Sequence, residues 1–297
     1  MSNIERMNGS EWQEGVAYAR GRFVEPGDAV IPIEDRAHQF GDGIYEVIRV
    51  IGGRPLLIDY HMERFEISAK AIKLRLDRSM DNLRQLVLDA IARSGYDDAQ
   101  VYFQLSRGLA RREHSFPDVP SHLSLTVRRM DDSVFEGARK HGLSMTWTED
   151  VRWKYCYIKS LNLLPNVMAK QAALDEGYQD AIFVRDGFVT ECTSSNIAIV
   201  KGQTVYTHPA NERVLHGVTR RFALKYLREA GVEVREEMFT MEDLMQADEV
   251  FTMSTIIEFA PVIKVNGTDV GVKTTSSDSV LRRLQSAYQS QIKRNEH

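Results

Sequence analysis

The feature of this sequence that most constrains its fold is a set of dipeptides that favour tight turns. Each lies next to short segments with the apolar pattern of β-strands. Asp186-Gly187 and Lys201-Gly202 each join two short alternating segments, and Gly52-Gly53 follows the strand pattern of residues 45–51. Two-residue connections of this composition favour the turns that close β-hairpins. The sequence therefore predicts antiparallel hairpins within residues 45–58, 181–190 and 197–207.

Apolar residues at helical spacing alternate with these strands and indicate a mixed α/β fold. Each predicted helix has one apolar stripe, and most end near a glycine. The predicted helices cover residues 60–72, 79–93, 166–176, 218–230 and 280–292. The character of the chain changes after Arg129, so we predict two domains: an N-terminal α/β domain, 1–130, and a C-terminal mixed α/β domain, 131–297.

Composition excludes several classes of function. The chain has 297 residues and a formal net charge of -4, and a negative net charge does not favour binding to nucleic acid. Its two cysteines, Cys156 and Cys192, cannot form a disulfide scaffold and fit a reducing compartment. No spaced metal-binding motif occurs, and no apolar run reaches transmembrane length. These observations predict a cytoplasmic protein without a metal.

Lys159 is the most informative single residue, because it lies in a strand-like apolar run, residues 155–164. An unpaired ammonium is costly to bury, so two interpretations stand. The lysine is either at the edge of a strand and reaches water, or its amine is used chemically. Desolvation makes a lysine amine nucleophilic, as a Schiff base with a carbonyl cofactor requires.

Three polar clusters elsewhere favour the chemical interpretation. Gly217-Val218-Thr219 opens a predicted helix, whose free N–H groups suit a phosphate. Glu191 is followed by small hydroxyl and amide residues at 192–196, and Ser254-Thr255 ends a predicted strand. Each cluster alone is more often an ordinary helix start or polar turn than a binding site. Together with Lys159 they suggest pyridoxal 5'-phosphate, a phosphorylated cofactor that forms Schiff bases.

The same segments resemble a known family, the fold-type IV pyridoxal-phosphate-dependent aminotransferases. The resemblance is carried by residues 40–47, 61–65, 157–164, 190–196 and 217–220, and their order and spacing agree over about residues 21–285. Within this family the chain most resembles the D-amino-acid aminotransferases. The first dozen residues look like an extension to which we assign no function.

The resemblance implies a role for each matching residue. Lys159 would form the Schiff base and then carry a proton between the substrate α-carbon and the cofactor. Glu191 would keep the pyridine nitrogen protonated. The remaining cofactor contacts would be Arg64, Val218, Thr219 and Thr255 at the phosphate, Ser194 as an orienting hydroxyl, and Leu215 against the ring. The cofactor would lie between the two domains.

The resemblance also implies a substrate site shared between subunits. Arg112 and His114 match an Arg-x-His pattern in a loop that a neighbouring subunit contributes, and Tyr45 would complete the trap for the substrate α-carboxylate. Arg111 precedes Arg112, so the sequence leaves open which arginine is the main ligand. This arrangement implies a homodimer that binds D-amino acids and 2-oxo acids.

The predicted activity is transfer of an amino group from D-alanine to 2-oxoglutarate by a ping-pong mechanism, giving pyruvate and D-glutamate. The alternatives of the same fold are a branched-chain L-amino-acid aminotransferase, an aminodeoxychorismate lyase and an (R)-amine transaminase. A cofactor-binding protein without turnover is the alternative from a different class.

Overall fold

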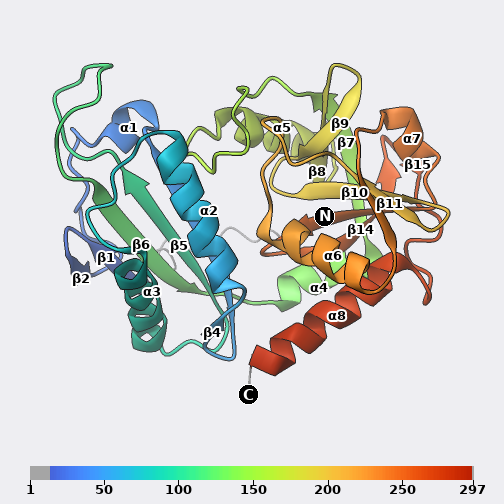
Figure 1. Ribbon diagram of the computed structural model, residues 1–297, viewed down its shortest axis with the longest axis horizontal. Coiled ribbons are helices and arrows are strands. Elements are labelled where there is room, and N and C mark those ends of the chain that lie inside the picture. Colours follow the sequence, from blue (N-terminus) through green and yellow to red (C-terminus); the bar gives the residue numbers. More distant parts are fainter. Residues whose placement is uncertain (1–13, 296–297) are drawn as a thin grey trace. The chain divides into compact units, whose positions relative to one another are not determined.

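The computed structural model describes residues 14–295, which form two compact units (Figure 1). The first unit extends to Asp131 and includes Lys159–Asn162; the second comprises Asp132–Ile158 and the chain from Leu163 onward. The predicted N-terminal extension, the first dozen residues, lies outside the described residues. Among residues 14–295, no helix combines the length and the apolar character that a membrane span requires.

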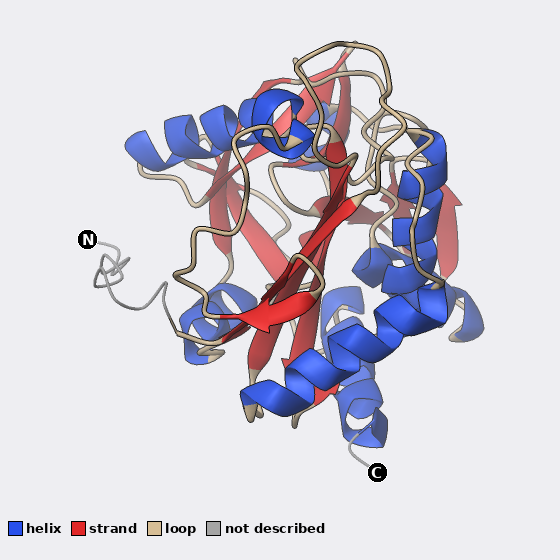
Figure 2. Cartoon of the chain, turned by 90° about the vertical axis from the view of Figure 1, so that its left-hand side faces the viewer, coloured by secondary structure: helices blue, strands red, loops and turns tan. Residues whose placement is uncertain are grey.

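The first unit is an antiparallel six-stranded sheet with helices packed on it. The strand order is β2-β1-β6-β5-β3-β4 (red in Figure 2). The strands are β1 Val16–Ala19, β2 Arg22–Val24, β3 Gly43–Ile51, β4 Arg54–Pro55, β5 Ala99–Ser106 and β6 His122–Arg129. The helices are α1 Arg36–Phe40, α2 Ile58–Ala71, which contacts β3, and α3 Met80–Ser94, which contacts β1 and β6. Buried and half-buried residues alternate along β5, so one face of the sheet meets the core.

The second unit is built on a larger mixed sheet. Its strand order is β12-β11-β10-β13-β14-β7-β8-β9, with β15 paired to β14. The strands are β7 Leu143–Glu149, β8 Asp180–Arg185, β9 Phe188–Cys192, β10 Asn196–Lys201, β11 Thr204–Thr207, β12 Glu233–Glu236, β13 Glu249–Ser254, β14 Glu258–Val265 and β15 Thr268–Asp269. The helices are α4 Ser133–His141, α5 Leu164–Asp175, α6 Val218–Glu229, α7 Met241–Met245 and α8 Val280–Asn295.

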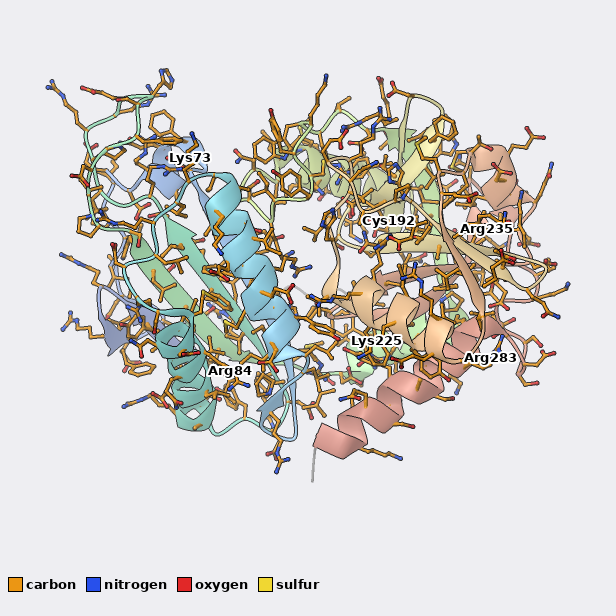
Figure 3. All side chains as sticks on the ribbon, viewed as in Figure 1. Lys73, Arg84, Cys192, Lys225, Arg235 and Arg283 are labelled. Carbon is orange, nitrogen blue, oxygen red and sulfur yellow. The ribbon has the colours of Figure 1, made fainter. Side chains whose placement is uncertain are left out.

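The central strands of the second unit are buried on both faces. The first four residues of β8 are buried, and so are the first five residues of β10 and of β13. Helices α4, α6 and α8 contact β13 or β14, and α5 contacts β7 and β8. Cys192 lies within this unit and, like Cys156, is a buried free thiol (Figure 3). Burial raises the pKa of both thiols, which makes them poor nucleophiles.

The prediction of a mixed α/β fold is confirmed, and so are the hairpins over Asp186-Gly187 and Lys201-Gly202. Two local predictions are wrong. The predicted hairpin over Gly52-Gly53 forms, but its second strand, expected over residues 55–58, covers only Arg54–Pro55, because helix α2 already begins at Ile58. Residues 155–164 do not form a strand: apart from one isolated bridge, Ile44 with Ser160, the run consists of turns and irregular backbone.

Candidate functional site

Lys159 lies beside the start of β3, in a segment of irregular backbone. Individual hydrogen bonds, rather than a strand ladder, hold this segment in place. Its N–H donates to Ser68 Oγ at 3.2 Å, and its carbonyl accepts the N–H of Tyr45 at 3.0 Å. The half-buried side chain places Nζ 4.3 Å from the ring centroid of Tyr45. No ion pair to Lys159 occurs within residues 14–295. The amine is therefore available for chemistry and faces a second predicted site residue.

Arg64 is held by a buried carboxylate in the same unit. Its Nε and Nη2 donate to the two oxygens of Glu46 at 2.7 and 2.8 Å, and His61 Nδ1 lies 2.7 Å from Glu46 Oε2. Burial raises the pKa of Glu46, but the charges of Arg64 and His61 outweigh it and lower the pKa to about 2. Burial also lowers the pKa of His61. A bidentate pair of this kind fixes the direction of the guanidinium.

The predicted substrate loop joins β5 to β6 and rests on helix α1. Arg112 Cζ lies 4.8 Å from the ring centroid of Phe40, and the His114 ring centroid lies 5.6 Å from the same ring. Both side chains are exposed, and no carboxylate pairs with either within the described residues. Arg111 makes no contact with this ring. The structure thus brings Arg112 and His114 together on one aromatic side chain.

Glu191 is the centre of the polar cluster in the second unit. Its Oε1 accepts a hydrogen bond from Arg152, and its Oε2 accepts from Asn196 Nδ2 at 2.9 Å and from the N–H of Leu215 at 3.1 Å. Arg152 is in turn held by the carboxylate of Asp150, with both contacts at 2.8 Å. Burial raises the pKa of Glu191 even though Arg152 opposes that shift. The carboxylate is therefore oriented firmly but lacks full charge compensation.

Helix α6 begins beside this carboxylate. Gly217 is its N-cap, and Val218 and Thr219 are its first two residues, whose N–H groups have no acceptor within the helix. Gly217 lies so close to Asn196 that an added Cβ would be 2.1 Å from Asn196 Oδ1. Asn196 Nδ2 also donates to the carbonyl of Leu215 at 2.9 Å. The start of α6 is thereby tied to Glu191 through one asparagine.

The predicted site residues are thus divided between the units. The first unit holds Lys159, Tyr45, Arg64, Arg112 and His114, and the second holds Glu191, Ser194, Leu215, Val218, Thr219 and Thr255. Ser194 is exposed and lies two residues after β9, and Thr255 is half-buried and directly follows β13. The roles assigned to all these residues remain predictions.

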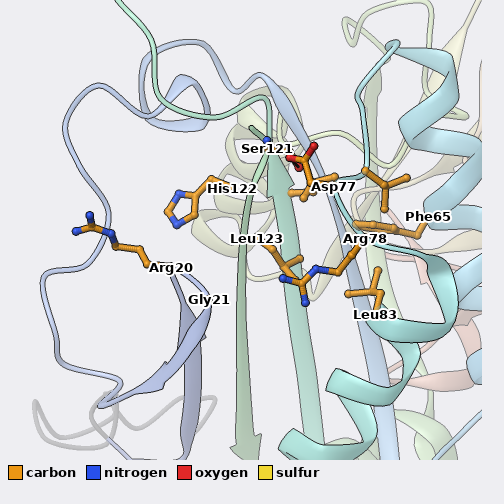
Figure 4. Close-up of a pocket in the computed structure, with 11 residues that line it drawn as sticks. Arg20, Gly21, Phe65, Asp77, Arg78, Leu83, Ser121, His122 and Leu123 are labelled. Carbon is orange, nitrogen blue, oxygen red and sulfur yellow. Dashed lines mark hydrogen bonds between the residues drawn. The ribbon is translucent and has the colours of Figure 1, made fainter. Parts of the chain in front are cut away.

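A separate cavity of about 200 Å³ lies in the first unit and contains none of the predicted residues (Figure 4). Its walls include Arg20, Arg78 and His122. Within residues 14–295, no group of three His, Cys, Asp or Glu side chains is arranged to hold a metal ion.

Comparison with known proteins identifies the family. A family model for amino-transferase class IV matches residues 43–265. The chain belongs to the class IV aminotransferases. The D-alanine aminotransferase of Listeria innocua serovar 6a is 39% identical to this aminotransferase over 251 residues, which cover 84% of the chain and 87% of that relative.

Solved structures agree with this assignment. The branched-chain amino acid aminotransferase of Escherichia coli superposes with a TM-score of 0.85 at 25% identity, covering 93% of this chain and 94% of its own. A hypothetical aminotransferase from Mycobacterium tuberculosis, in a PLP-bound form, gives a TM-score of 0.81 at 23% identity, covering 92% and 98%. The predicted family and its mixed α/β fold are therefore confirmed.

Three groups of residues that contribute to the geometry were missed by the sequence analysis. They are Arg152 with Asp150, Asn196 as the link to α6, and the pair Arg36 and Phe40 in α1. Asn196 was noted only as a member of a polar cluster, and Phe40 only as the first residue of the matching segment 40–47. No local signal in the sequence pairs Arg152 with Glu191, because 39 residues separate them.

Proposed function

We propose that this class IV aminotransferase transfers the amino group of D-amino acids, with D-alanine as donor and 2-oxoglutarate as acceptor, by a ping-pong mechanism. The observation that carries the proposal is the placement of Arg112 and His114 on Phe40, exposed and without an acidic partner in the described chain. An arginine fork of this kind suits a planar carboxylate. The 39% identity to a D-alanine aminotransferase supports the same substrate class.

The cofactor is pyridoxal 5'-phosphate, and the residues present fit it. Glu191 is a buried carboxylate whose raised pKa would be relieved by a pyridinium N–H. The N–H groups of Val218 and Thr219 at the start of α6 suit a phosphate, with Arg64 and Thr255 as further predicted ligands. When bound, the cofactor withdraws electrons from the substrate α-carbon and stores the amino group.

Side chains of this protein would carry out the proton transfer and bind the substrate. Lys159 would hold the cofactor between turnovers, and its amine would accept the proton that leaves the substrate α-carbon. Arg112, His114 and Tyr45 bind the α-carboxylate and so determine which α-hydrogen faces Lys159. Stereochemistry then follows from the position of the trap.

The proposal includes a homodimer, in which the loop that carries Arg112 and His114 serves the active site of the neighbouring subunit. A cytoplasmic location is part of the same proposal, because two buried thiols fit a reducing compartment.

The deciding experiment is the visible absorbance of the purified holoenzyme before and after addition of D-alanine or L-alanine. We expect D-alanine alone to bleach the band of the bound cofactor and 2-oxoglutarate to restore it. Bleaching by an L-amino acid instead would favour the branched-chain activity named for the Escherichia coli structure. Absence of any cofactor band after reconstitution would refute the proposal.

A pair of lysine variants tests the Schiff-base residue. Lys159→Ala should abolish multiple turnover, because the variant lacks the amine proposed to form the Schiff base and carry the proton. Lys154→Ala, at an exposed position five residues away, should retain the wild-type rate and serves as the control. Full steady-state activity in Lys159→Ala would disprove the assignment of Lys159.

A further inference from the structure

Helix α1 lies under the substrate loop and contacts it through both backbone and side chains. The N–H of Arg36 donates to the carbonyl of Gly108 at 3.1 Å, and the N–H of Ala110 donates to that of Glu34 at 3.3 Å. Farther along the loop, Arg36 Nη1 donates to the carbonyl of Glu113 at 2.6 Å. The acceptor is the residue between Arg112 and His114, so the guanidinium of Arg36 fixes the backbone of the trap itself.

The ring of Phe40 is the point where the side chains meet. The guanidinium carbons of Arg36 and Arg112 lie 4.7 and 4.8 Å from its centroid, and the ring of His114 is tilted by 50° at 5.6 Å. A cation is attracted to the face of an aromatic ring within about 6 Å. One ring therefore orients both members of the predicted trap.

Charge at this place favours an anion. The carboxylate of Asp42 accepts from Arg36 at 2.8 Å and from Arg107 at 2.9 Å, so one negative charge serves two guanidinium groups. Arg112 adds a third cation with no carboxylate partner in residues 14–295. Asp42 and these three arginines together carry a net positive charge, and Arg112, at Phe40, is the member whose charge a substrate carboxylate would neutralise.

We propose that Phe40 and Arg36 are positioning residues for the carboxylate trap, and that through Arg112 and His114 they determine the preference of the enzyme for substrates with an α-carboxylate. The inference rests on the proposed function and deepens it. A loop of exposed residues would otherwise sample many conformations, and fixing two ligands before binding lowers the entropic cost of recognition.

Phe116 supplies a matched control in the same loop. It is exposed, and the guanidinium of Arg107 lies 3.7 Å from its ring centroid, but it contacts neither Arg112 nor His114. Phe40→Leu and Phe116→Leu therefore remove the same aromatic group from under an arginine. Only the first change touches the trap.

The kinetic test follows bleaching of the holoenzyme band at increasing D-alanine concentration. We expect Phe40→Leu to raise the half-saturating concentration about tenfold while the limiting rate changes by less than about twofold. The inhibition constant of propionate, an unreactive carboxylate, should rise in parallel. Phe40→Tyr keeps the ring and should restore both values, Arg36→Lys should act as Phe40→Leu does, and Phe116→Leu should behave as the wild type.

A second readout does not depend on catalysis. Trypsin cuts after arginine, and both Arg111 and Arg112 are exposed in this loop. Release of the loop should make cleavage there several-fold faster in Phe40→Leu than in the wild type or in Phe116→Leu. This comparison reports on the contact between Phe40 and the loop even if D-alanine is not the substrate.

The outcomes separate the two claims. If the wild type does not respond to D-alanine, the proposed function fails, and the cleavage rates still test whether Phe40 holds the loop. If the wild type responds but Phe40→Leu has unchanged half-saturation, or Phe116→Leu shows the same rise, the positioning role is wrong. A lowered limiting rate with unchanged half-saturation would also overturn it.

Discussion

At the scale of single residues, the charge of Glu191 depends on Arg152. Both side chains are only 6% exposed, and burial already raises the pKa of the carboxyl. Arg152→Gln would leave the carboxylate without its cationic partner, which costs about 3–5 kcal/mol for a buried pair. We expect urea unfolding of the apoprotein to show a loss of this size.

Arg185→Gln is the control for that change. Arg185 also pairs with Asp150, at 2.9 Å, but has no contact with Glu191. Asp150 keeps Arg152 in this variant, so the loss of stability should be clearly smaller. Equal losses in the two variants would mean that Asp150, rather than Glu191, is the group that the arginines stabilise.

Arg112 and Arg111 are adjacent, and their different surroundings predict different kinetics. Arg112 rests on Phe40, whereas Arg111 makes no such contact. Arg112→Ala should raise the KM for D-amino acids by the equivalent of about 1.5–3 kcal/mol, the range for a hydrogen bond to a charged group. Arg111→Ala should leave KM near the wild-type value. The reverse pattern would assign the trap to Arg111.

Residue types predicted the chemistry of the site better than its contacts. Lys159 and Glu191 stand out because a lysine in an apolar run and a carboxylate before a hydroxyl cluster are unusual locally, whereas Arg112 and His114 were predicted only from the family resemblance. Their partners do not stand out. Arg152 and Asn196 act on Glu191 from other segments, and sequence alone gives no measure of such long-range distances.

At the scale of elements, the start of α6 combines a close backbone approach with the predicted phosphate site. Gly217 has an extended backbone, with φ -62° and ψ 137°, that any residue can adopt, so the absence of a side chain matters only for space. In Gly217→Ala the new Cβ would meet Asn196 Oδ1 at 2.1 Å and displace the amide from Glu191 and Leu215. We expect weaker binding of pyridoxal phosphate, by roughly tenfold, and a loss of about 1–3 kcal/mol in stability.

Gly137→Ala in helix α4 is the matched control for this substitution. An added Cβ meets nothing within 4 Å there, and the position is inside a helix. Alanine should stabilise it by about 0.5–1 kcal/mol and leave cofactor affinity unchanged. If titration of the apoenzyme gave equal affinities for both variants, the close approach at α6 would have no role in binding.

Elements with strong local signals were predictable, and short or irregular ones were not. Helix α3 has an apolar stripe, a Ser79 cap and a terminal Gly95, all of which the structure shows. Helix α1 has five residues, too few for a helical period to appear. The segment at Lys159 looked like a strand because its residues are apolar, but its hydrogen bonds go to Gly43, Tyr45 and Ser68 rather than to a continuous ladder.

At the scale of the whole molecule, Glu46 links the stability of the first unit to pH. Its pKa falls from 4.5 to about 2 in the folded protein, so the ionised carboxylate stabilises the fold above pH 4.5. This contribution, about 3 kcal/mol, should be lost progressively as the pH falls from 4.5 towards 2. Glu46→Gln should be less stable at neutral pH and should flatten this part of the curve of unfolding free energy against pH. An unchanged slope would contradict the role of Glu46.

The proposed homodimer makes a prediction that no single variant can test. If each active site uses its own Lys159 and the partner's Arg112, a dimer of one Lys159→Ala chain and one Arg112→Ala chain contains one complete site. Random reassembly of equal amounts should then restore about a quarter of the wild-type activity at the wild-type KM. Neither variant alone should show this activity. If the loop instead served its own subunit, every site in the mixture would lack one of the two residues, and mixing would restore nothing. Activity assays at low D-alanine concentration, before and after subunit exchange, therefore decide whether the trap crosses the subunit boundary.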